Sequence, residues 1–426
     1  MKVLVIGGGG REHALVWKLS QSKMITRLYA APGNPGMARC STLVPIKADA
    51  VAELAAFAET ERIDLTVVGP EQPLALGVVD VFQSRGLKIF GPTKAAADLE
   101  CSKIFAKELM AKHGIPTARF HAADDAGSAR RRVREFGAPV VVKADGLAGG
   151  KGAIVCRTLE EADRAIATCF EEKAFGAAGE RVVVEEFLEG EEASFFALTD
   201  GEAILPMGVA QDHKAVFDGD RGPNTGGMGA YSSPSMMAGE LAGEVMERIV
   251  APTVRAMAAE GRPYRGVVYA GLMLTKDGPK VVEFNCRFGD PEAQVILTRL
   301  GDDLLPLLIA VAESGGLPSE AAWTPESSVC VVLASGGYPG GYATGKIITG
   351  VEQAESHQSV VVFHAGTAMK EGRLVTAGGR VLGVTARAVS LGAAISLAYE
   401  ATGKISFEGI HYRRDIGKRA PARLER

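Results

Sequence analysis

The residues best suited to chemistry lie in one short run, 281–292, whose alternating apolar and polar side chains predict a strand that ends in a polar loop. Glu283 and Asn285 are two positions apart, so we expect both side chains on the same face of that strand. A carboxylate beside an amide oxygen suits Mg²⁺, which takes one or two protein ligands and completes its shell with phosphate and water. Arg287 continues this face and can hold an anion with its forked guanidinium. The run predicts a phosphoryl-transfer centre, with an edge strand of solvated polar residues as the simpler alternative.

A glycine run, 7–10, lies between the first apolar run and a predicted helix over 11–21. Backbone N–H groups at such a turn can approach a phosphate, and the N-terminus of the following helix favours negative charge. A dinucleotide-binding fold is disfavoured, because Glu12 or His13 stands where a third glycine belongs and no acid follows the second predicted strand. The segment favours phosphate binding, with a tight turn before a charged first helical turn as the alternative.

A second glycine-rich segment, 143–152, lies between two predicted strands. It is not a P-loop, because its spacing is one residue short and Gly152 replaces the Ser or Thr that would bind Mg²⁺. Lys143 and Lys151 flank the glycines and can act as point charges over a polyphosphate chain. A surface hairpin with two solvated lysines is the alternative.

Two further polar segments can bind ligands. In the first, a buried strand at 182–186 leads into an acidic run, where backbone groups of 186–188 can bond an adenine edge and a nearby acid the ribose hydroxyls. A solvated acidic turn is the alternative. In the second, Asp212 and His213 precede a glycine cluster, 222–229, that predicts an anion-receiving backbone concavity. A lone histidine of this kind is more often structural than a general base.

The coarse pattern predicts an α/β and α+β multidomain protein. Residues 2–100 alternate strands and helices, which indicates an open parallel sheet with ligands at the strand carboxyl ends. The pattern over 94–113 predicts a helix, and 121–189 predicts a small α+β unit that acts as a lid. A boundary is expected near 325, so the predicted parts are 1–100, 101–120 together with 190–325, 121–189 and 326–426.

Size and composition bound the function classes. A chain of 426 residues is too long for one ordinary core, so two to four domains are expected. A net charge of −4 gives no general attraction to nucleic acid or anionic membranes. The six cysteines are scattered, which argues against a zinc knuckle or a disulfide framework and fits a reducing cytosol. Without a signal peptide or a membrane-spanning run, we expect a cytoplasmic protein.

Several of these segments occur in an order that resembles the ATP-grasp superfamily: Lys143 and Lys151 in a glycine loop, the strand ending at 185–188, and Glu283 with Asn285. The resemblance narrows to the phosphoribosylamine–glycine ligase (glycinamide ribonucleotide synthetase) family of purine biosynthesis through the segments 7–14, 69–71, 212–214 and 285–292. It covers nearly the whole chain, and the combination is specific even though each piece is not. One departure is Cys286, which stands where the family has a small hydrophobic residue and which we expect to be a packing residue.

The resemblance implies an N-terminal open parallel α/β sheet, a central ATP-grasp pair of subdomains and a small C-terminal domain. The ATP-binding residues that it implies are Lys103, Lys143, Gly149, Gly150, Lys151, Glu185, Glu186, Phe187, Leu188 and Glu191, with Glu192 as an alternative to Glu191. Glu283 and Asn285 are implied as ligands of Mg²⁺ or Mn²⁺.

The implied reaction joins glycine to 5-phosphoribosylamine and converts ATP to ADP and phosphate through a glycyl phosphate intermediate. The candidate substrate-binding residues are Gly8, Gly9, Gly10, Arg11, Asp212, Gly226, Gly227 and Arg287, of which Asp212 and Arg287 are also catalytic candidates. The expected partners are these small molecules and neither nucleic acid nor membrane, and the expected state is a monomer or weak homodimer.

Three other functions stay open. The nearest is another ATP-grasp carboxylate–amine ligase or carboxylase that acts on a neighbouring purine intermediate. A nicotinamide-dependent oxidoreductase would use the first glycine turn, 7–10. A nucleotide-binding sensor would bind ATP and Mg²⁺ without releasing ADP.

Overall fold

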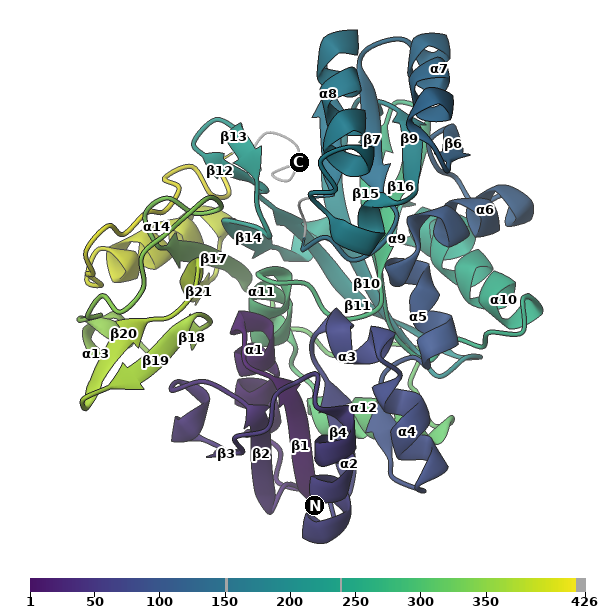
Figure 1. Cartoon of the computed structure of the whole chain (residues 1–426). Coiled ribbons are helices and arrows are strands. Elements are labelled where there is room, and N and C mark those ends of the chain that lie inside the picture. The colour runs from purple at the N-terminus through teal and green to yellow at the C-terminus, as the bar shows by residue number, and fades with distance from the viewer. Residues whose placement is uncertain (150–151, 238–239, 419–426) are drawn as a thin grey trace.

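The computed structural model describes residues 1–149, 152–237 and 240–418. Figure 1 shows a parallel sheet near the N-terminus at the bottom, a small sheet with two helices at the top, and the C-terminal strands with a helix on the left. Between them runs a long antiparallel sheet.

The N-terminal sheet is parallel throughout, with the strand order β3-β2-β1-β4-β5. Its strands are β1 (Lys2–Gly7), β2 (Arg27–Pro32), β3 (Thr42–Leu43), β4 (Leu65–Val68) and β5 (Ile89–Phe90), and its helices are α1 (Gly10–Leu19), α2 (Val51–Glu61), α3 (Glu71–Ala75) and α4 (Val78–Ser84). The apolar run 3–6 has no exposed surface, as a strand covered on both faces requires. Helix α1 begins at the last glycine of the run, and the Glu12 carboxylate in its first turn accepts a hydrogen bond from Gly9 N–H at 2.7 Å.

The prediction of one helix over 94–113 is wrong: α5 (Lys94–Cys101) and α6 (Lys103–His113) are separate helices. Ser102 between them has an extended backbone, with φ −128° and ψ 109°. Its hydroxyl accepts a hydrogen bond from Phe105 N–H and so caps α6. The apolar pattern continues on both sides of Ser102, so periodicity alone does not reveal the break.

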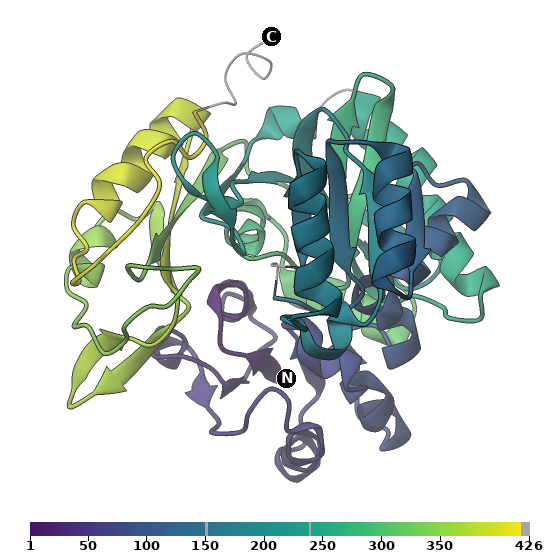
Figure 2. The same ribbon diagram turned by 45° about the horizontal axis from the view of Figure 1, so that its top comes forward.

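The region expected to act as a lid is a four-stranded sheet with the order β6-β9-β7-β8. It comprises β6 (Phe120–Ala123), β7 (Val140–Ala144), β8 (Ala153–Cys156) and β9 (Val182–Glu186), with helices α7 (Ala126–Phe136) and α8 (Leu159–Phe170). Figure 2 shows both helices in front of the strands. Together they enclose a core of their own, which includes Val133, Val142, Ile166 and Val184. The sequence pattern does not predict strand β6 or helix α7.

An eight-stranded antiparallel sheet forms the middle of the molecule, in the order β16-β15-β10-β11-β14-β17-β21-β18. Its strands are β10 (Glu191–Thr199), β11 (Ile204–Asp212), β14 (Gly229–Ser232), β15 (Gly266–Thr275), β16 (Gly278–Asn285), β17 (Ser327–Ala334), β18 (Val360–His364) and β21 (Arg380–Ala388). The sheet passes across the chain boundary expected near 325, because β14 pairs with β17. The four-part division of the chain stays a prediction.

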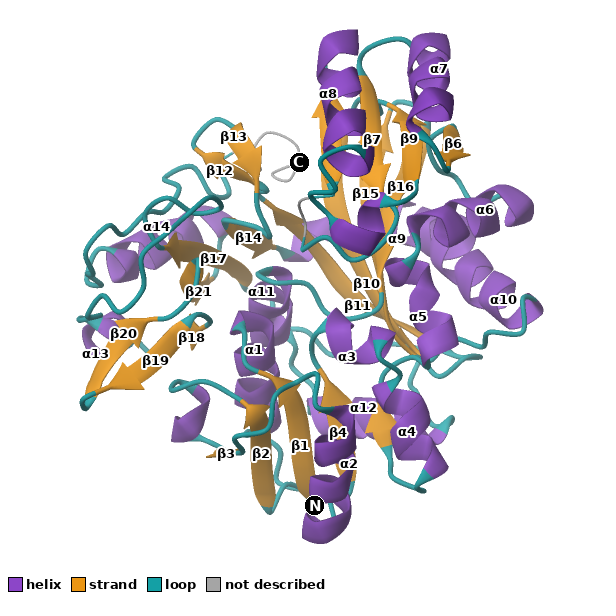
Figure 3. Cartoon of the chain, in the orientation of Figure 1, coloured by secondary structure: helices purple, strands orange, loops and turns teal. Residues whose placement is uncertain are grey.

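The remaining elements surround this sheet (Figure 3). They are α9 (Glu240–Val245), α10 (Ala251–Ala259), α11 (Glu292–Arg299), α12 (Leu304–Glu313), α13 (Val351–Ala354) and α14 (Leu391–Thr402), with the hairpins β12 (Ala215–Phe217)–β13 (Arg221–Asn224) and β19 (Thr367–Lys370)–β20 (Arg373–Thr376). Helix α11 is buried along its whole length between α1 and the long sheet. Among the described residues, no helix combines the length and apolar character needed to span a bilayer.

Candidate active site

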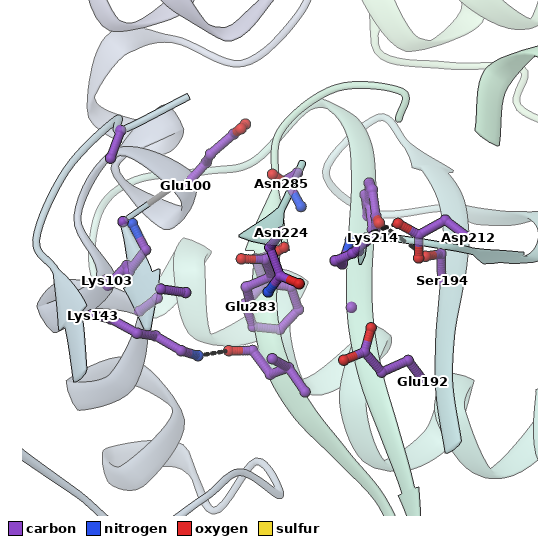
Figure 4. A pocket seen from close by; sticks show the side chains of 18 of the residues that line it. Glu100, Lys103, Lys143, Glu192, Ser194, Asp212, Lys214, Asn224, Glu283 and Asn285 are labelled. Atoms are coloured by element: carbon purple, nitrogen blue, oxygen red, sulfur yellow. Dashed lines mark hydrogen bonds and ion pairs between the residues drawn. The ribbon is translucent and has the colours of Figure 1, made fainter. Parts of the chain in front are cut away.

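A cavity of about 480 Å³, here called the central cavity, is lined by residues of the N-terminal, lid, middle and C-terminal regions. Most predicted site residues line it, namely Arg11, Lys103, Lys143, Gly149, Glu185, Glu186, Phe187, Leu188, Asp212, Gly226, Glu283, Asn285 and Arg287. Figure 4 shows Lys103 and Lys143 on one side of Glu283, with Asp212 and Lys214 on the other. The fold therefore gathers residues that are far apart in the chain.

Other predicted site residues are placed differently. Gly8, Gly9, Gly10, Gly227 and Glu191 are not among the residues that line the cavity, whereas Glu192 is. Gly150 and Lys151 lie outside the described residues.

The Glu283–Asn285 pair stands at the end of β16, and both residues line the central cavity. Glu283 pairs with Gly271 across the sheet, and a Cβ on that glycine would lie 3.2 Å from Glu283 Cγ, so the glycine leaves room for the carboxylate. Burial opposes ionisation of Glu283, but Lys214, Lys143 and Lys103 outweigh it and lower its pKa. Glu283 is therefore an ionised carboxylate among ammonium groups.

Three lysines approach the cavity from α6 and β7. Lys103 Nζ donates to Gly146 O at 2.8 Å, and Lys143 Nζ donates to Val282 O at 2.8 Å. Lys107 and Lys143 each lie 3.1 Å from the same carboxylate oxygen, Glu185 Oε2. Burial lowers the pKa of Lys107 to about 8 against the opposing effect of Glu185. The second oxygen, Glu185 Oε1, is buried and has no hydrogen-bond partner within the part of the chain that the structure describes.

Arg287 is already paired with two acids that the sequence did not reveal. Its Nη2 lies 2.9 Å from Glu100 Oε1, and its Nε donates to Glu71 Oε2 at 3.1 Å. Burial raises the pKa of Glu71, but Arg287 and Arg11 outweigh burial and lower it to about 2. The other oxygen of Glu100 accepts a hydrogen bond from Cys286 N–H at 2.7 Å. Glu100 therefore holds the chain directly after Asn285.

Asp212 also has a partner, because Lys214 Nζ donates to its Oδ2 at 2.8 Å. Close by, the Tyr269 hydroxyl donates to Glu292 Oε1 at 2.7 Å. Burial and the Asp212 charge raise the pKa of Glu292. Burial opposes ionisation of Lys214, yet its acidic neighbours raise its pKa well above the ordinary value. This part of the cavity is rich in acidic side chains, and the Lys214 ammonium group already pairs with one of them.

The glycines of the run 7–10 are closely packed. A Cβ on Gly8 would lie 2.7 Å from Gly33 O, and one on Gly10 would lie 2.6 Å from Gln294 Nε2. Gly9 N–H is bonded to Glu12, whose side chain also fills the space beside Gly7. Packing against the Gly33 backbone therefore accounts for Gly8 without a ligand, whereas at Gly9 and Gly10 the nearest atoms are the ends of the flexible Glu12 and Gln294 side chains.

Sequence reasoning gave no role to several residues that line the central cavity: Glu71, Glu100, Lys107, Lys214, Tyr269, Asp290, Glu292 and Arg380. Glu71 belongs to a segment noted only for the family resemblance, and Glu100 reads as an ordinary position near the end of a helix. Cys286 is buried, which agrees with its expected packing role.

Comparison with known protein families gives consecutive matches along the chain. The models for the N domain, the ATP-grasp (A) domain and the C domain of phosphoribosylglycinamide synthetase match residues 1–100, 101–293 and 328–419. A phosphoribosylamine–glycine ligase of Vibrio vulnificus (strain CMCP6) is 54% identical over 426 residues, covering 99% of each chain.

Solved structures agree with these matches. The phosphoribosylamine–glycine ligase of Thermotoga maritima superposes with a TM-score of 0.86 at 34% identity, covering 98% of this chain and 100% of its own. The biotin carboxylase domain of the Hydrogenobacter thermophilus 2-oxoglutarate carboxylase, solved with MgADP, has a TM-score of 0.74 at 19% identity, covering 96% of this chain and 91% of its own. The second likeness is one of fold alone. The chain belongs to the phosphoribosylglycinamide synthetase family.

Proposed function

We propose that this enzyme joins glycine to 5-phosphoribosylamine and converts ATP to ADP and phosphate, in purine biosynthesis. The full-length matches to named ligases support the reaction class. The observation that carries the proposal at the level of the site is Glu283, an ionised carboxylate that faces the central cavity among Lys103, Lys143 and Lys214. Ammonium groups around a carboxylate suit a polyphosphate with its bound divalent cation, because the lysines can face the phosphates while the carboxylate faces the cation.

ATP is proposed to occupy the part of the central cavity between the lid and α6. Lys103 and Lys143 would face its phosphates, and Lys151, outside the described residues, is expected to join them. The buried Glu185 Oε1 needs a donor, which the amino group of adenine can supply. Apolar walls for the adenine ring come from Val141, Val155, Leu272 and Met273. The backbone of 186–188 is proposed to hold the adenine edge, and Glu192 or Glu191 the ribose.

Glu283 and Asn285 fit Mg²⁺ or Mn²⁺. Their oxygens are hard ligands, and the lowered pKa of Glu283 keeps its carboxylate deprotonated for the metal. Among the described residues, no group of three or more His, Cys, Asp or Glu side chains is arranged to hold a metal. A two-ligand site is what Mg²⁺ uses when substrate phosphates and water complete its shell. Bound there, the cation would neutralise charge on the transferring phosphoryl group.

Glycine and phosphoribosylamine are proposed to bind on the opposite side of the cavity. Asp212 is the candidate for the glycine ammonium and Arg287 for a negatively charged substrate group. The run 8–10 with Arg11 is the candidate for the 5′-phosphate, since the N-terminus of α1 favours an anion. Gly226 and Gly227 would border the same substrate.

The proposed reaction has two transfers. The γ-phosphoryl group of ATP passes to the glycine carboxylate and gives glycyl phosphate, with ADP as leaving group. The amine of phosphoribosylamine then attacks the activated carbonyl, the new C–N bond forms, phosphate leaves and the amine loses a proton. The lysines stabilise negative charge as it spreads over the phosphoryl oxygens, and the lid is proposed to exclude water from the acyl phosphate.

We further propose a cytoplasmic protein that is a monomer or weak homodimer, without nucleic acid or membrane partners. The absence of paired cysteine spacing and the small net charge support this proposal. Another ATP-grasp ligase or carboxylase remains the second candidate, because the fold is shared with biotin carboxylase domains.

The test is ADP release by the full chain with ATP, Mg²⁺, glycine and freshly made phosphoribosylamine, omitting each in turn. We expect ADP only when all four are present. ADP release that continues with bicarbonate or formate in place of glycine would favour the second candidate. ATP binding without ADP release under any of these conditions would contradict both.

A further inference from the structure

Arg380 connects the C-terminal region to the central cavity. It is the first residue of β21, which Figure 1 places among the C-terminal strands, away from the lid. Its Nη1 donates to Gly226 O at 2.7 Å and to Asp290 O at 2.5 Å, with Gly227 O at 3.4 Å. Its Nη2 lies 3.3 Å from Asp290 Oδ2. One guanidinium therefore joins two loops that border the cavity, and each belongs to a different part of the chain.

The two loops are packed so closely that only glycine fits between them. Gly227 has a φ of +114°, and a Cβ there would lie 2.5 Å from Pro291 Cδ. A Cβ on Gly226 would lie 3.0 Å from Arg380 Cζ. The guanidinium and the two loops thus form one packed unit, in which a shift of Arg380 must be shared by its neighbours.

Asp290 extends this unit to the glycine run of the N-terminal region. Its Oδ1 accepts a hydrogen bond from Gln294 Nε2 at 2.7 Å, and a Cβ on Gly10 would lie 3.2 Å from the same oxygen. Burial would raise the pKa of Asp290, but the charges of Arg380 and Arg11 lower it, so the carboxylate is ionised where it pairs with Arg380. Three regions of the chain meet at this carboxylate.

We propose that Arg380 is a positioning residue for phosphoribosylamine, which sets the shape of that substrate's site by holding Gly226, Gly227 and Asp290 beside the glycine run. The inference rests on the proposed function, which places this substrate on the same side of the cavity. Arg380 acts through the loops, because its Nη1 donates to their carbonyls and its Nη2 lies beside the Asp290 carboxylate. Within the described residues, no hydrogen bond or ion pair joins Lys103, Lys107 or Lys143 to this unit, so we expect ATP binding not to depend on it.

Lysine is a poor substitute at this position. A single ammonium can pair with the Asp290 carboxylate, but it cannot donate in a planar fork to carbonyls of two loops at the same time. Arg380→Lys should therefore retain the charge and part of the loop geometry, while Arg380→Met removes both.

The experiment compares steady-state ADP release by the full-length wild type, Arg380→Met and Arg380→Lys, with each substrate varied in turn. For Arg380→Met we expect KM for phosphoribosylamine to rise about tenfold to a hundredfold, the range found when a residue that orients the ligands of a metal site is lost. Arg380→Lys should fall between Arg380→Met and wild type. KM for glycine, and Kd for ATP measured by calorimetry without the amine, should stay within about twofold of wild type.

Two comparisons make the outcome decisive. Arg387→Met removes another arginine of β21, which pairs with Glu326 at 3.3 Å. It should leave KM for phosphoribosylamine, KM for glycine and Kd for ATP unchanged. Arg11→Met tests the proposed amine site itself. If Arg11→Met raises KM for phosphoribosylamine and the Arg380 variants do not, the role proposed for Arg380 is wrong, whereas the proposed phosphoribosylamine site is supported. If no Arg11 or Arg380 variant changes this KM while ADP release still requires the amine, the proposed phosphoribosylamine site is wrong, and the role of Arg380 with it.

A general structural role gives a different pattern. Arg380→Met would then raise Kd for ATP and KM for glycine along with KM for phosphoribosylamine, or lower the melting temperature without changing any constant. Either result would overturn the inference. If Arg380→Met does not fold, Arg380→Lys carries the same comparison.

Discussion

The two sides of the central cavity carry positive charge in different ways. On the side proposed for the nucleotide, Lys107 and Lys143 pair with one carboxylate, Glu185. Lys103, Lys107 and Lys143 otherwise donate to the neutral oxygens of Gly146, Thr117 and Val282. On the side proposed for phosphoribosylamine, the arginines are each matched with acids: Arg11 with Glu12 and Glu71, Arg287 with Glu71 and Glu100, and Arg380 with Asp290.

The difference in charge pairing indicates that the lysines and the arginines have different roles. Lysines with unbalanced charge can stabilise a polyphosphate as its charge spreads during transfer. Arginines that are already neutralised have less charge to offer a substrate, and their forked geometry instead fixes the loops around it. We therefore expect changes on the nucleotide side to lower turnover and changes on the other side to affect one substrate's KM.

Glu283→Ala should have the largest effect. It removes the carboxylate proposed to hold the metal, and we expect kcat to fall by about two to three orders of magnitude, as for the loss of one preorganised charged partner. ADP release at saturating substrates measures this. Asp277→Ala, an exposed acid at the other end of the same hairpin, is the matched control and should retain wild-type kcat. Near-normal turnover in Glu283→Ala would exclude this residue as the metal ligand.

Lys103→Met tests the unbalanced charge itself. A hydrogen bond to a charged group contributes about 1.5–3 kcal/mol, so we expect kcat/KM for ATP to fall about tenfold to a hundredfold. Lys112→Met changes an exposed lysine of the same helix, which pairs with Glu260, and should have no effect. An equal loss in kcat/KM for phosphoribosylamine at saturating ATP, with ATP kinetics unchanged, would reverse the assignment of the two sides.

Local sequence pattern predicted the parts of the site that are local in the chain. The buried first strand, the strand–loop–strand of the lid and the shared face of Glu283 and Asn285 all follow from periodicity within a few residues. The pattern also suggested that Arg287 holds a substrate anion, whereas the structure pairs it with Glu71 and Glu100. Those acids come from α3 and α5, so the residues near Arg287 in the sequence do not predict them.

The same reasoning explains what was missed in the fold. Helix α7, 126–136, carries several arginines and few apolar residues, so the segment reads as a polar stretch even though Ala129 and Val133, four positions apart, share its buried face. Arg380 lies in a glycine-rich part of the chain, and its partners Gly226 and Asp290 lie far from it in sequence. Long-range polar pairs depend on how the sheet is assembled, which one sequence does not specify.

Acid should lower the stability of the folded protein through two buried histidines near the glycine run 7–10. His13 Nδ1 accepts a hydrogen bond from His364 N–H at 2.7 Å, and the Asn34 amide bridges Gly8 O and His364 O. Burial, followed by the charges of His364 and Arg39, lowers the pKa of His13 to about 3. Burial and Arg39 lower the pKa of His364 to about 4. Both rings are therefore neutral in the folded protein at neutral pH.

The sign of the pH dependence follows from these lowered values. Below the unfolded histidine pKa of about 6.5, the unfolded chain binds protons that the folded chain does not, so stability falls as pH decreases towards 3–4. Each histidine should contribute about 1.4 kcal/mol per pH unit in that window and nothing above it. Urea unfolding at pH 7.5, 6 and 5 measures the slope. His13→Gln should reduce it, whereas His357→Gln, at an exposed position, should not.

The smallest expected effect distinguishes two neighbouring acids at the ribose end of the nucleotide side. Glu191 and Glu192 open β10, and successive residues of a strand face opposite sides. Only Glu192 of the two lines the central cavity as described. A single hydrogen bond to a ribose hydroxyl contributes about 0.5–1.5 kcal/mol, so Glu192→Gln should raise KM for ATP about twofold to tenfold. Glu191→Gln serves as the matched variant and should leave that KM unchanged, because its side chain leaves the strand on the other face. A raised KM for ATP in Glu191→Gln but not in Glu192→Gln would place the ribose outside the central cavity. The nucleotide would then lie away from Lys103, and the proposed division of the cavity into two sides would be wrong.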